Sequence, residues 1–199
     1  MSATASLSAG AGHRARLTGG LAAAIAETGY AAATIADVVR HARVSKRTFY
    51  EHFADKEACF LALYSETTDA LLALIADEVA NARGGWDERL ATAARAYFNR
   101  LAAEPALIRT GLIEIQAAGP TARALRREVQ HRYADMLRSL SEEAAAEEPG
   151  ITPLSPVLAT AVVGGIDELM LEAVEAGQEH RIAELAGAAI ELIRAVLAR

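Results

Sequence analysis

Hydroxyl-bearing and cationic side chains are concentrated in residues 34–56, which read TIADVVRHARVSKRTFYEHFADK. Within this segment Ser45, Lys46, Arg47 and Thr48 follow one another directly. Ammonium and guanidinium groups donate hydrogen bonds to guanine edges or to phosphates, and hydroxyls can serve either role. We therefore expect these four residues to face the bases of a DNA major groove.

The spacing of apolar residues predicts two short helices on either side of a tight turn at residues 42–44. In the second helix Phe49 and Phe53 lie four residues apart, so both can pack against one core. Lys46 and Tyr50, also four residues apart, then point away from that core. A short helix pair whose second member has an exposed polar face is the arrangement of a helix-turn-helix motif.

The overall composition limits the kinds of protein that the chain can be. It has 199 residues, of which 52% are hydrophobic and 23% charged, enough for a sizeable core and a charged surface. A single cysteine, Cys59, excludes an internal disulfide framework and most zinc sites. No apolar run approaches the roughly 20 residues that span a bilayer, and the first dozen residues do not resemble a signal peptide. We expect a cytoplasmic protein with no membrane partner.

Charge is distributed unevenly along the chain, whose formal net charge is −6. Residues 1–60 hold seven Lys or Arg against five Asp or Glu, which gives +2 and leaves −8 for the remainder. A small basic module joined to an acidic body favours a polyanionic partner for the first part, although the imbalance is small on its own.

Alanine, leucine, isoleucine and valine recur at three- and four-residue spacing almost throughout, and no segment alternates apolar and polar residues for long. The sequence therefore predicts an all-α fold of about nine helices. Their expected positions are about 13–28, 35–42, 45–53, 55–83, 86–103, 105–118, 120–147, 155–177 and 180–199.

The same pattern predicts three parts along the chain. Residues 1–12 are rich in Ala, Ser and Gly and are expected to be a disordered tail. Residues 13–65 are expected to form the helix-turn-helix DNA-binding domain, with its motif at 34–53. Residues 66–199 are expected to form a helical domain for effector binding and dimerisation.

About a dozen positions in the first domain resemble, in order and spacing, the N-terminal domain of TetR-type transcriptional regulators. The matching residues are Gly29-Tyr30, Thr34, Ile35-Ala36, Val44-Ser45, Thr48, Tyr50, His52-Phe53 and Lys56-Glu57. The motif resemblance covers roughly residues 13–65, whereas the remainder matches such regulators only in its architecture. This resemblance implies a dimeric DNA-binding protein whose helical body binds a ligand.

The resemblance also implies roles for individual residues. The positions that face bases in the family correspond to Lys46, Arg47 and Thr48. The positions that hold phosphates correspond to Thr34, Tyr50, His52 and Lys56.

Three residues bear on these assignments. Arg43 and Arg47 stand where the family often has glycine, so Arg43 must enter the turn without the conformational freedom of glycine. Arg47 then alters which bases are read. Glu51 accepts from cytosine, pairs with Arg47 or faces away, and the sequence leaves these three alternatives open.

Polar residues interrupt the apolar stripes of the helices between residues 86 and 177. The best candidates for a buried effector pocket are Tyr97, Gln116 and Tyr133, and Asn99, Arg109 and Asp167 are further polar residues of this kind. The alternative is that any one of them is a surface residue or a core polar group satisfied by its neighbours.

The last two predicted helices are strongly apolar. A hairpin of this size exposes more apolar surface than a monomer tolerates, so we expect a homodimer formed as a four-helix bundle. Dimerisation would also place two recognition helices on the half-sites of an inverted repeat in double-stranded DNA. The alternative is that both helices complete an internal bundle.

The sequence offers no catalytic constellation. The five histidines share no metal-ligand spacing, and no phosphate-binding loop follows a strand, so we expect no metal, no cofactor and no enzyme activity. We interpret the chain as a sequence-specific DNA-binding transcriptional regulator, a repressor released from its operator by a small molecule. The alternatives are an all-helical ligand-binding or enzymatic bundle with a non-functional DNA-binding head, and a regulator that responds to another protein.

Overall fold

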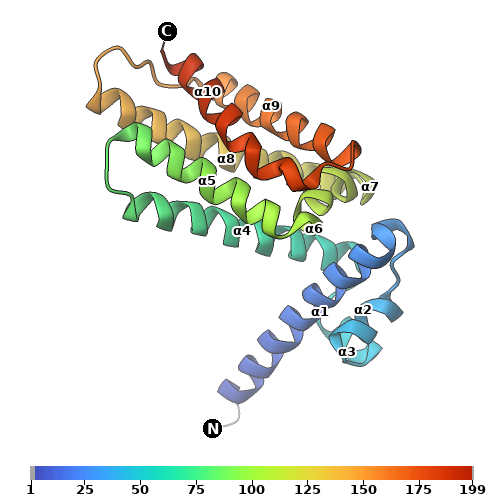
Figure 1. The fold of residues 1–199 in the computed structure, drawn as a ribbon. Coiled ribbons are helices and arrows are strands. Elements are labelled where there is room, and N and C mark those ends of the chain that lie inside the picture. Colours follow the sequence, from blue (N-terminus) through green and yellow to red (C-terminus); the bar gives the residue numbers. More distant parts are fainter. Residues whose placement is uncertain (1–2, 199) are drawn as a thin grey trace. The chain divides into compact units, whose positions relative to one another are not determined.

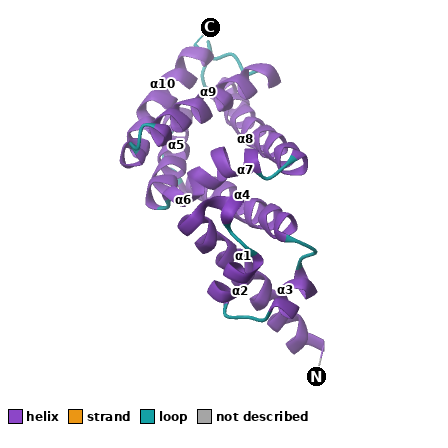
Figure 2. Ribbon diagram, turned by 90° about the vertical axis from the view of Figure 1, so that its right-hand side faces the viewer, coloured by secondary structure: helices purple, strands orange, loops and turns teal. Residues whose placement is uncertain are grey.

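The computed structural model describes residues 3–198, with side chains from residue 12 onward except that of Pro105. The regular structure of these residues is entirely helical, which confirms the all-α prediction (Figures 1 and 2). The chain forms two compact units. The first comprises the chain up to Thr67 together with Ile113–Leu125, and the second comprises Thr68–Leu112 and the chain from Arg126 onward.

The first unit is built around the N-terminal helices. These are α1 (Ala3–Ala32), α2 (Ile35–Ala42), α3 (Lys46–His52) and the first part of α4 (Lys56–Asn81). Helix α1 is assigned from Ala3, so it overlaps the segment 1–12 that the sequence predicts as a disordered tail, and that prediction stays untested. Residues 1–2 lie outside the described part. Helical geometry is interrupted at Gly29, whose φ of 76° lies at the predicted stop.

Each of the four main helices of the first unit contributes at least one large side chain to its core. Leu17 and Leu21 of α1, Val38 of α2, Phe49 of α3 and Phe60 of α4 are fully buried. Burying each contributes about 1.5–3 kcal/mol. The prediction that Phe49 of the second short helix packs into the core is therefore confirmed.

A close approach of α1 to α2 depends on Gly20. A Cβ at this position would lie 2.6 Å from the carbonyl oxygen of Val38, closer than any side chain tolerates. The absence of a side chain lets the two backbones meet and fixes α2 against α1.

The second unit is a bundle of longer helices. Its elements are the remainder of α4, α5 (Trp86–Ala103), α6 (Pro105–Ile108), most of α8 (Pro120–Glu147), α9 (Pro156–Glu175), the 3₁₀ turn η2 (Glu179–Glu184) and α10 (Leu185–Leu197). The expected single helix at 105–118 is wrong, because a π-helical turn, η1 (Arg109–Glu114), separates α6 from α7 (Ile115–Ala117). The predicted bounds of α5 and the Ser155 cap of α9 are confirmed.

Helices α5, α8, α9 and α10 contribute to one apolar cluster of the second unit. Its buried members are Leu90, Ala134, Leu154, Ala159, Val162, Ile193 and Leu197. The buried hydroxyl of Ser141 donates to the Arg138 carbonyl at 2.7 Å and accepts from the Leu154 backbone at 3.0 Å. This pair of hydrogen bonds fastens the loop before α9 to α8.

Among the described residues, α4 is the one helix long and apolar enough to cross a membrane by length and composition. Its Phe60 and Ile75 are buried within the protein, at 0% and 1% exposure. Core helices pass the same test, so the apolar face of α4 is explained by packing.

Candidate nucleic-acid interface and apolar cavity

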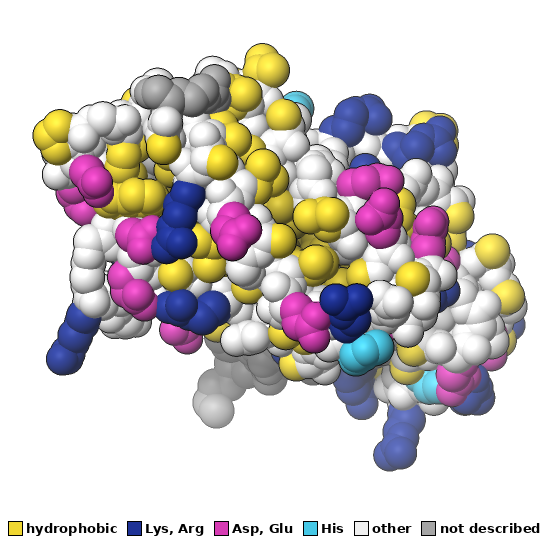
Figure 3. Space-filling model, turned by 45° about the horizontal axis from the view of Figure 1, so that its top comes forward, with side chains coloured by type: hydrophobic (Ala, Val, Ile, Leu, Met, Phe, Trp, Pro, Cys, Tyr) yellow, Lys and Arg dark blue, Asp and Glu magenta, His cyan; other side chains and the backbone are white. Residues whose placement is uncertain are grey.

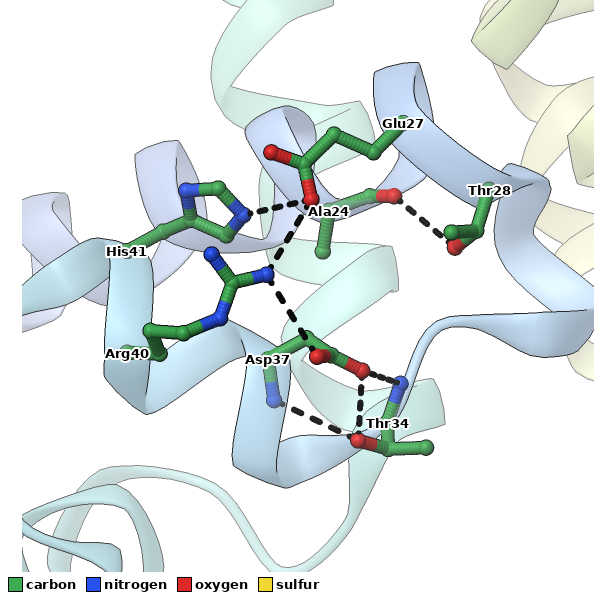
Figure 4. A network of polar contacts seen from close by, with 7 residues as sticks. All are labelled: Ala24, Glu27, Thr28, Thr34, Asp37, Arg40 and His41. Atoms are coloured by element: carbon green, nitrogen blue, oxygen red, sulfur yellow. Dashed lines mark hydrogen bonds and ion pairs between the residues drawn. The ribbon is translucent and has the colours of Figure 1, made fainter.

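Thr34 opens α2 with a reciprocal cap. Its hydroxyl accepts from the Asp37 backbone N–H at 3.3 Å and donates to the Asp37 carboxylate at 2.6 Å, and that carboxylate also accepts from the Thr34 N–H at 3.1 Å (Figure 4). These bonds lower the pKa of Asp37, the side-chain bond from Thr34 most. Thr34 is therefore the N-cap of α2, and the hydroxyl expected to hold a phosphate is engaged inside the cap.

A charged network joins α1 to α2. Arg40 Nη2 donates to Glu27 Oε2 at 3.1 Å, and the Nε2 atom of His41 lies 3.1 Å from the same oxygen (Figure 4). The hydrogen bond from Arg40, followed by that from His41, lowers the pKa of Glu27. The network fixes the outer side of α2 while Gly20 fixes its inner side.

The turn between α2 and α3 places a non-glycine residue in the left-handed region. Arg43 has φ 52° and ψ 49°, and its N–H donates to the Arg40 carbonyl. Arg43 therefore adopts the conformation that glycine usually supplies, at a cost of roughly 1–2 kcal/mol.

Helix α3 begins with a second hydroxyl cap. Ser45 Oγ accepts from the Thr48 N–H at 3.0 Å, and the two hydroxyl oxygens lie 2.9 Å apart. The cap orients the first turn of α3, so both hydroxyls are partly committed to the protein. Lys46 and Arg47 are the exposed cations of this turn.

Arg47 and Glu51 form an ion pair on the outer face of α3. Arg47 Nε donates to Glu51 Oε1 at 3.1 Å, and the Arg47 side chain is 89% exposed. Of the three alternatives for Glu51, the structure has the pair with Arg47. An exposed pair of this kind is worth little in stability, so the arginine can exchange it for a base or phosphate.

Tyr50 and His52 continue the polar face of α3. Tyr50 is 58% exposed, and its ring stands edge-on to Phe49 with centroids 5.5 Å apart. His52 is half-buried, and its ring stands edge-on to His13 at 6.2 Å. Packing against neighbouring rings orients both side chains, and the Tyr50 side chain is the more exposed of the two.

Lys56, which the family resemblance makes a phosphate contact, is turned toward the end of α1. Its ammonium donates to the carbonyls of Tyr30 at 2.7 Å and Ala33 at 2.8 Å, and it lies 4.3 Å from the centre of the Tyr30 ring. Burial lowers the pKa of Lys56. These carbonyls belong to the end of α1, where backbone acceptors lack helical partners. Lys56 thus closes α1, and its expected phosphate contact, which no DNA-free structure tests, would have to exchange these bonds.

Glu114 is a residue of the first unit that the sequence did not single out. Its carboxylate accepts from the Tyr30 backbone N–H at 3.0 Å, across 84 positions of the chain. The same carboxylate lies close to Gly29, where a Cβ would be 3.4 Å from Oε1. Glu114 therefore holds the interruption in α1 from outside, and no local sequence signal indicated it.

The second unit contains an apolar cavity of about 90 Å³. It is lined by residues of α4, α5, α8, α9 and α10, namely Ile75, Leu90, Ala93, Ala94, Tyr97, Phe98, Tyr133, Met136, Leu137, Leu140, Val163, Ile166, Asp167, Ala189 and Ile193. Two of the three predicted pocket residues, Tyr97 and Tyr133, lie on its wall with ring centroids 5.6 Å apart.

Gln116 does not line this cavity. It is exposed on α7, in the first unit. The preceding π-helical turn has i→i+5 hydrogen bonding, which changes the face on which the following residues lie. The pattern that placed Gln116 inward assumed a continuous α-helix, whereas the side chain is exposed after the π-helical turn.

Asp167 is the one carboxylate on the cavity wall. Its Oδ2 atom accepts from Arg126 Nη2 at 3.0 Å and from Gln130 Nε2 at 2.8 Å. Burial raises the pKa of Asp167, while these two partners act against the rise. The carboxylate is thus neutralised by α8, and the remaining wall is almost wholly apolar.

Comparison with known proteins identifies the first unit. Residues 20–63 match the sequence profile of the bacterial regulatory proteins of the tetR family. No curated protein matches the chain.

Solved structures match nearly the whole chain. The transcriptional regulator FadR from Bacillus subtilis, in complex with stearoyl-CoA, is 21% identical with a TM-score of 0.79, over 89% of this chain and 96% of that one. FadR from Bacillus halodurans is 22% identical with a TM-score of 0.80, over 90% and 93%. A TetR-family regulator from Mesorhizobium loti is 22% identical with a TM-score of 0.72, over 94% and 97%. Residues 20–63 therefore carry the DNA-binding domain of the tetR family of bacterial regulatory proteins, and the chain as a whole has the fold of these solved regulators.

Proposed function

We propose that the protein is a cytoplasmic, homodimeric repressor that binds an inverted repeat in double-stranded DNA and is released by a small apolar molecule. The observation that carries the DNA-binding part is the division of α3 into two faces. Phe49 is fully buried, whereas the side chains of Lys46, Arg47 and Tyr50 are exposed to solvent. A helix anchored by one face and cationic on the other suits the major groove.

The contacts divide into two classes. Lys46 and Arg47 lie in the first turn of α3, the part of a recognition helix that reaches base edges, with Ser45 and Thr48 beside them. Tyr50 and His52 lie further along and suit phosphates, which fix the register of the protein on DNA. Thr34 reaches a phosphate only by giving up part of its cap.

Apolar side chains that remain exposed on the last long helices support the dimer. Val157 is 77% exposed on α9, and Leu169 and Leu192 remain exposed on α9 and α10. Figure 3 shows one face of the molecule on which apolar side chains lie between charged ones. Pairing α9 and α10 with a second copy would cover such residues and would set the spacing of two reading heads.

The cavity supports release by a ligand. A ligand bound there favours whichever arrangement of the helices holds it best, and a coupling of about 1–3 kcal/mol between ligand and operator is typical of such regulators. The apolar wall favours an apolar effector. The structural neighbour from Bacillus subtilis was solved with stearoyl-CoA, whose acyl chain is of this kind. The protein needs no catalytic activity for this role.

Selection of bound duplexes from a random DNA pool tests the proposal. The wild-type protein is expected to enrich an inverted repeat. Tyr50→Ala is expected to weaken binding to all enriched sequences, because it removes a phosphate contact, and Arg47→Ala to relax preference at one base pair by about 1–3 kcal/mol. Tyr50→Phe is the matched control that keeps the ring against Phe49.

If the wild-type protein enriches no sequence at low salt, the regulator proposal is overturned. The helical body would then have to be tested as a ligand-binding or enzymatic bundle with a non-functional DNA-binding head.

A further inference from the structure

The ion pair between Arg47 and Glu51 engages only one edge of the arginine. Arg47 Nε donates to Glu51 Oε1 at 3.1 Å, and among the described residues Glu51 is the partner of this guanidinium. The Arg47 side chain is 89% exposed. Its two terminal amino groups, Nη1 and Nη2, are therefore open to another ligand while Nε stays bound to the carboxylate.

The open edge of Arg47 suits one DNA base. A guanidinium is planar and carries five N–H donors in a fixed fork. Guanine presents two acceptors, O6 and N7, side by side in the major groove, and a bidentate contact from arginine is the commonest specific one. Nη1 and Nη2 supply two such donors without Nε. Arg47 can therefore contact guanine end-on and keep its bond to Glu51.

The two exposed cations in the first turn of α3 differ in the residue that stands one helical turn further along. Tyr50 follows Lys46 by four positions, whereas Glu51 follows Arg47 by four. Residues four apart are neighbours on the surface of a helix. The carboxylate thus orients Arg47, whereas Lys46 is a point charge on a flexible stem. The selectivity of this turn is therefore expected to be greatest at the base pair that Arg47 contacts.

Helix α3 gives the pair a rigid base. The helix is anchored by Phe49, which is 0% exposed, and its first turn is capped by the bond from the Thr48 N–H to Ser45 Oγ at 3.0 Å. Both partners of the ion pair extend from this fixed helix. Their pairing restricts the rotamers of Arg47 before DNA is bound, so less side-chain freedom is lost when the arginine meets a base.

The balance of charge in the pair makes its contribution to binding depend on the base. An exposed ion pair is weak because solvent screens it, but the attraction between the two charges increases where DNA displaces water. The pair carries no net charge, so it adds little to the sequence-independent attraction of phosphates. Where no guanine accepts from Arg47, the pair gains little from the DNA.

We propose, on the basis of the proposed function, that Glu51 is a positioning residue that holds Arg47 for an end-on contact with one guanine in each half-site. Arg47 makes the contact with the base. Glu51 fixes the orientation of the guanidinium and offsets its charge toward other sequences. Glu51 thereby determines the selectivity of α3 although it acts through another side chain.

Binding of the full-length protein to four duplexes tests this. They are the selected operator and three duplexes in which the base pair relaxed by Arg47→Ala is changed in one half-site. The ratio of the affinity for the guanine duplex to the best of the other three is expected to be about 5–150 for the wild type. Glu51→Ala is expected to lower it roughly three- to tenfold. Glu51→Gln keeps an acceptor oxygen and is expected to lower it less.

Two controls separate positioning from a general effect of charge or stability. The double variant Arg47→Ala/Glu51→Ala is expected to be no less selective than Arg47→Ala, because Glu51 acts through Arg47. Glu66→Ala removes the same charge and an equivalent exposed pair away from α3, in which Arg14 Nε donates to Glu66 Oε1 at 3.1 Å. It is expected to leave the ratio unchanged. Glu51→Ala is expected to melt within about 2 °C of the wild type.

The other outcomes overturn the inference and leave the regulator proposal standing. A preference of Arg47 for a base other than guanine would do so. Relaxation by Glu51→Ala at a different base pair would mean that Glu51 itself accepts from cytosine. An unchanged ratio with tighter binding to all four duplexes would mean that Glu51 only repels phosphates. A wild-type protein that enriches no sequence would overturn the proposed function and this inference together.

Discussion

Replacement of Lys56 by methionine separates a structural from a DNA-binding role for this side chain. Lys56→Met keeps the aliphatic stem and removes the ammonium that donates to the Tyr30 and Ala33 carbonyls at 2.7 and 2.8 Å. A hydrogen bond from a charged group contributes about 1.5–3 kcal/mol, and the partial exposure of Lys56 puts each bond at the low end. We expect the free energy of unfolding to fall by about 3 kcal/mol and the melting temperature by roughly 6–12 °C.

The other lysine of the chain, Lys46, provides a matched control. Lys46 is exposed on α3, so Lys46→Met is expected to leave the melting temperature unchanged within about 2 °C and to weaken operator binding. If Lys46 also neutralises a phosphate, the slope of log affinity against log salt concentration becomes shallower by about one unit. Lys56→Met is expected to leave that slope unchanged at a temperature where the protein is folded.

Thermal unfolding and salt titration of operator binding, measured on both variants, decide between the two roles. An unchanged melting temperature together with a slope reduced by about one unit for Lys56→Met would refute our assignment. Lys56 would then be the phosphate contact that the family resemblance implies, and its bonds to the end of α1 would contribute nothing measurable.

Four further expectations concern single residues of the first unit. Thr34→Ala removes the cap of α2 and is expected to cost about 1 kcal/mol in thermal unfolding, whereas Thr34→Ser is expected to preserve stability. Arg43→Gly removes the steric strain of the left-handed backbone at φ 52°, so the melting temperature is expected to rise. No rise would contradict a strain of roughly 1–2 kcal/mol at this position. Burial raises the pKa of the Cys59 thiol to about 12, so iodoacetamide at pH 8 is expected to label it only after unfolding, as mass spectrometry would detect. The hydrogen bond from Arg40 is the main reason why the pKa of Glu27 is lowered. The contribution of Glu27 to stability is therefore present above its ordinary pKa of 4.5 and is lost as the pH falls through the lower folded-state value. Glu27→Gln is expected to remove that part of the pH dependence of the free energy of unfolding.

The features that could be predicted from the sequence depend on short-range interactions. The caps at Thr34 and Ser45 each join residues three positions apart, and the left-handed turn at Arg43 follows from a tight connection between two helices. The burial of Phe49 follows from helical periodicity alone. Such signals are contained in a window of a few residues, so the sequence displays them directly.

The features that could not be predicted depend on contacts between distant parts of the chain. Lys56 reaches Tyr30 across 26 positions, and Glu114 reaches the same residue across 84. The family resemblance gave Lys56 the role of a phosphate contact, and neither the resemblance nor any local pattern gave Glu114 a role. The exposure of Gln116 was not anticipated for a different reason. The hydrophobic pattern of residues 105–118 does not show that a π-helical turn precedes Gln116.

Two of the helices that line the cavity, α4 and α8, contribute residues to both units. The cavity wall includes Ile75 of α4 and Met136 of α8. Both helices also extend into the first unit, α4 from Lys56 to Thr67 and α8 from Pro120 to Leu125. A helix transmits a displacement along its axis because each turn is hydrogen-bonded to the next. Under the proposed function, occupancy of the cavity is therefore expected to act on helices that contribute to both units, so a ligand could change operator affinity without contacting the DNA-binding unit.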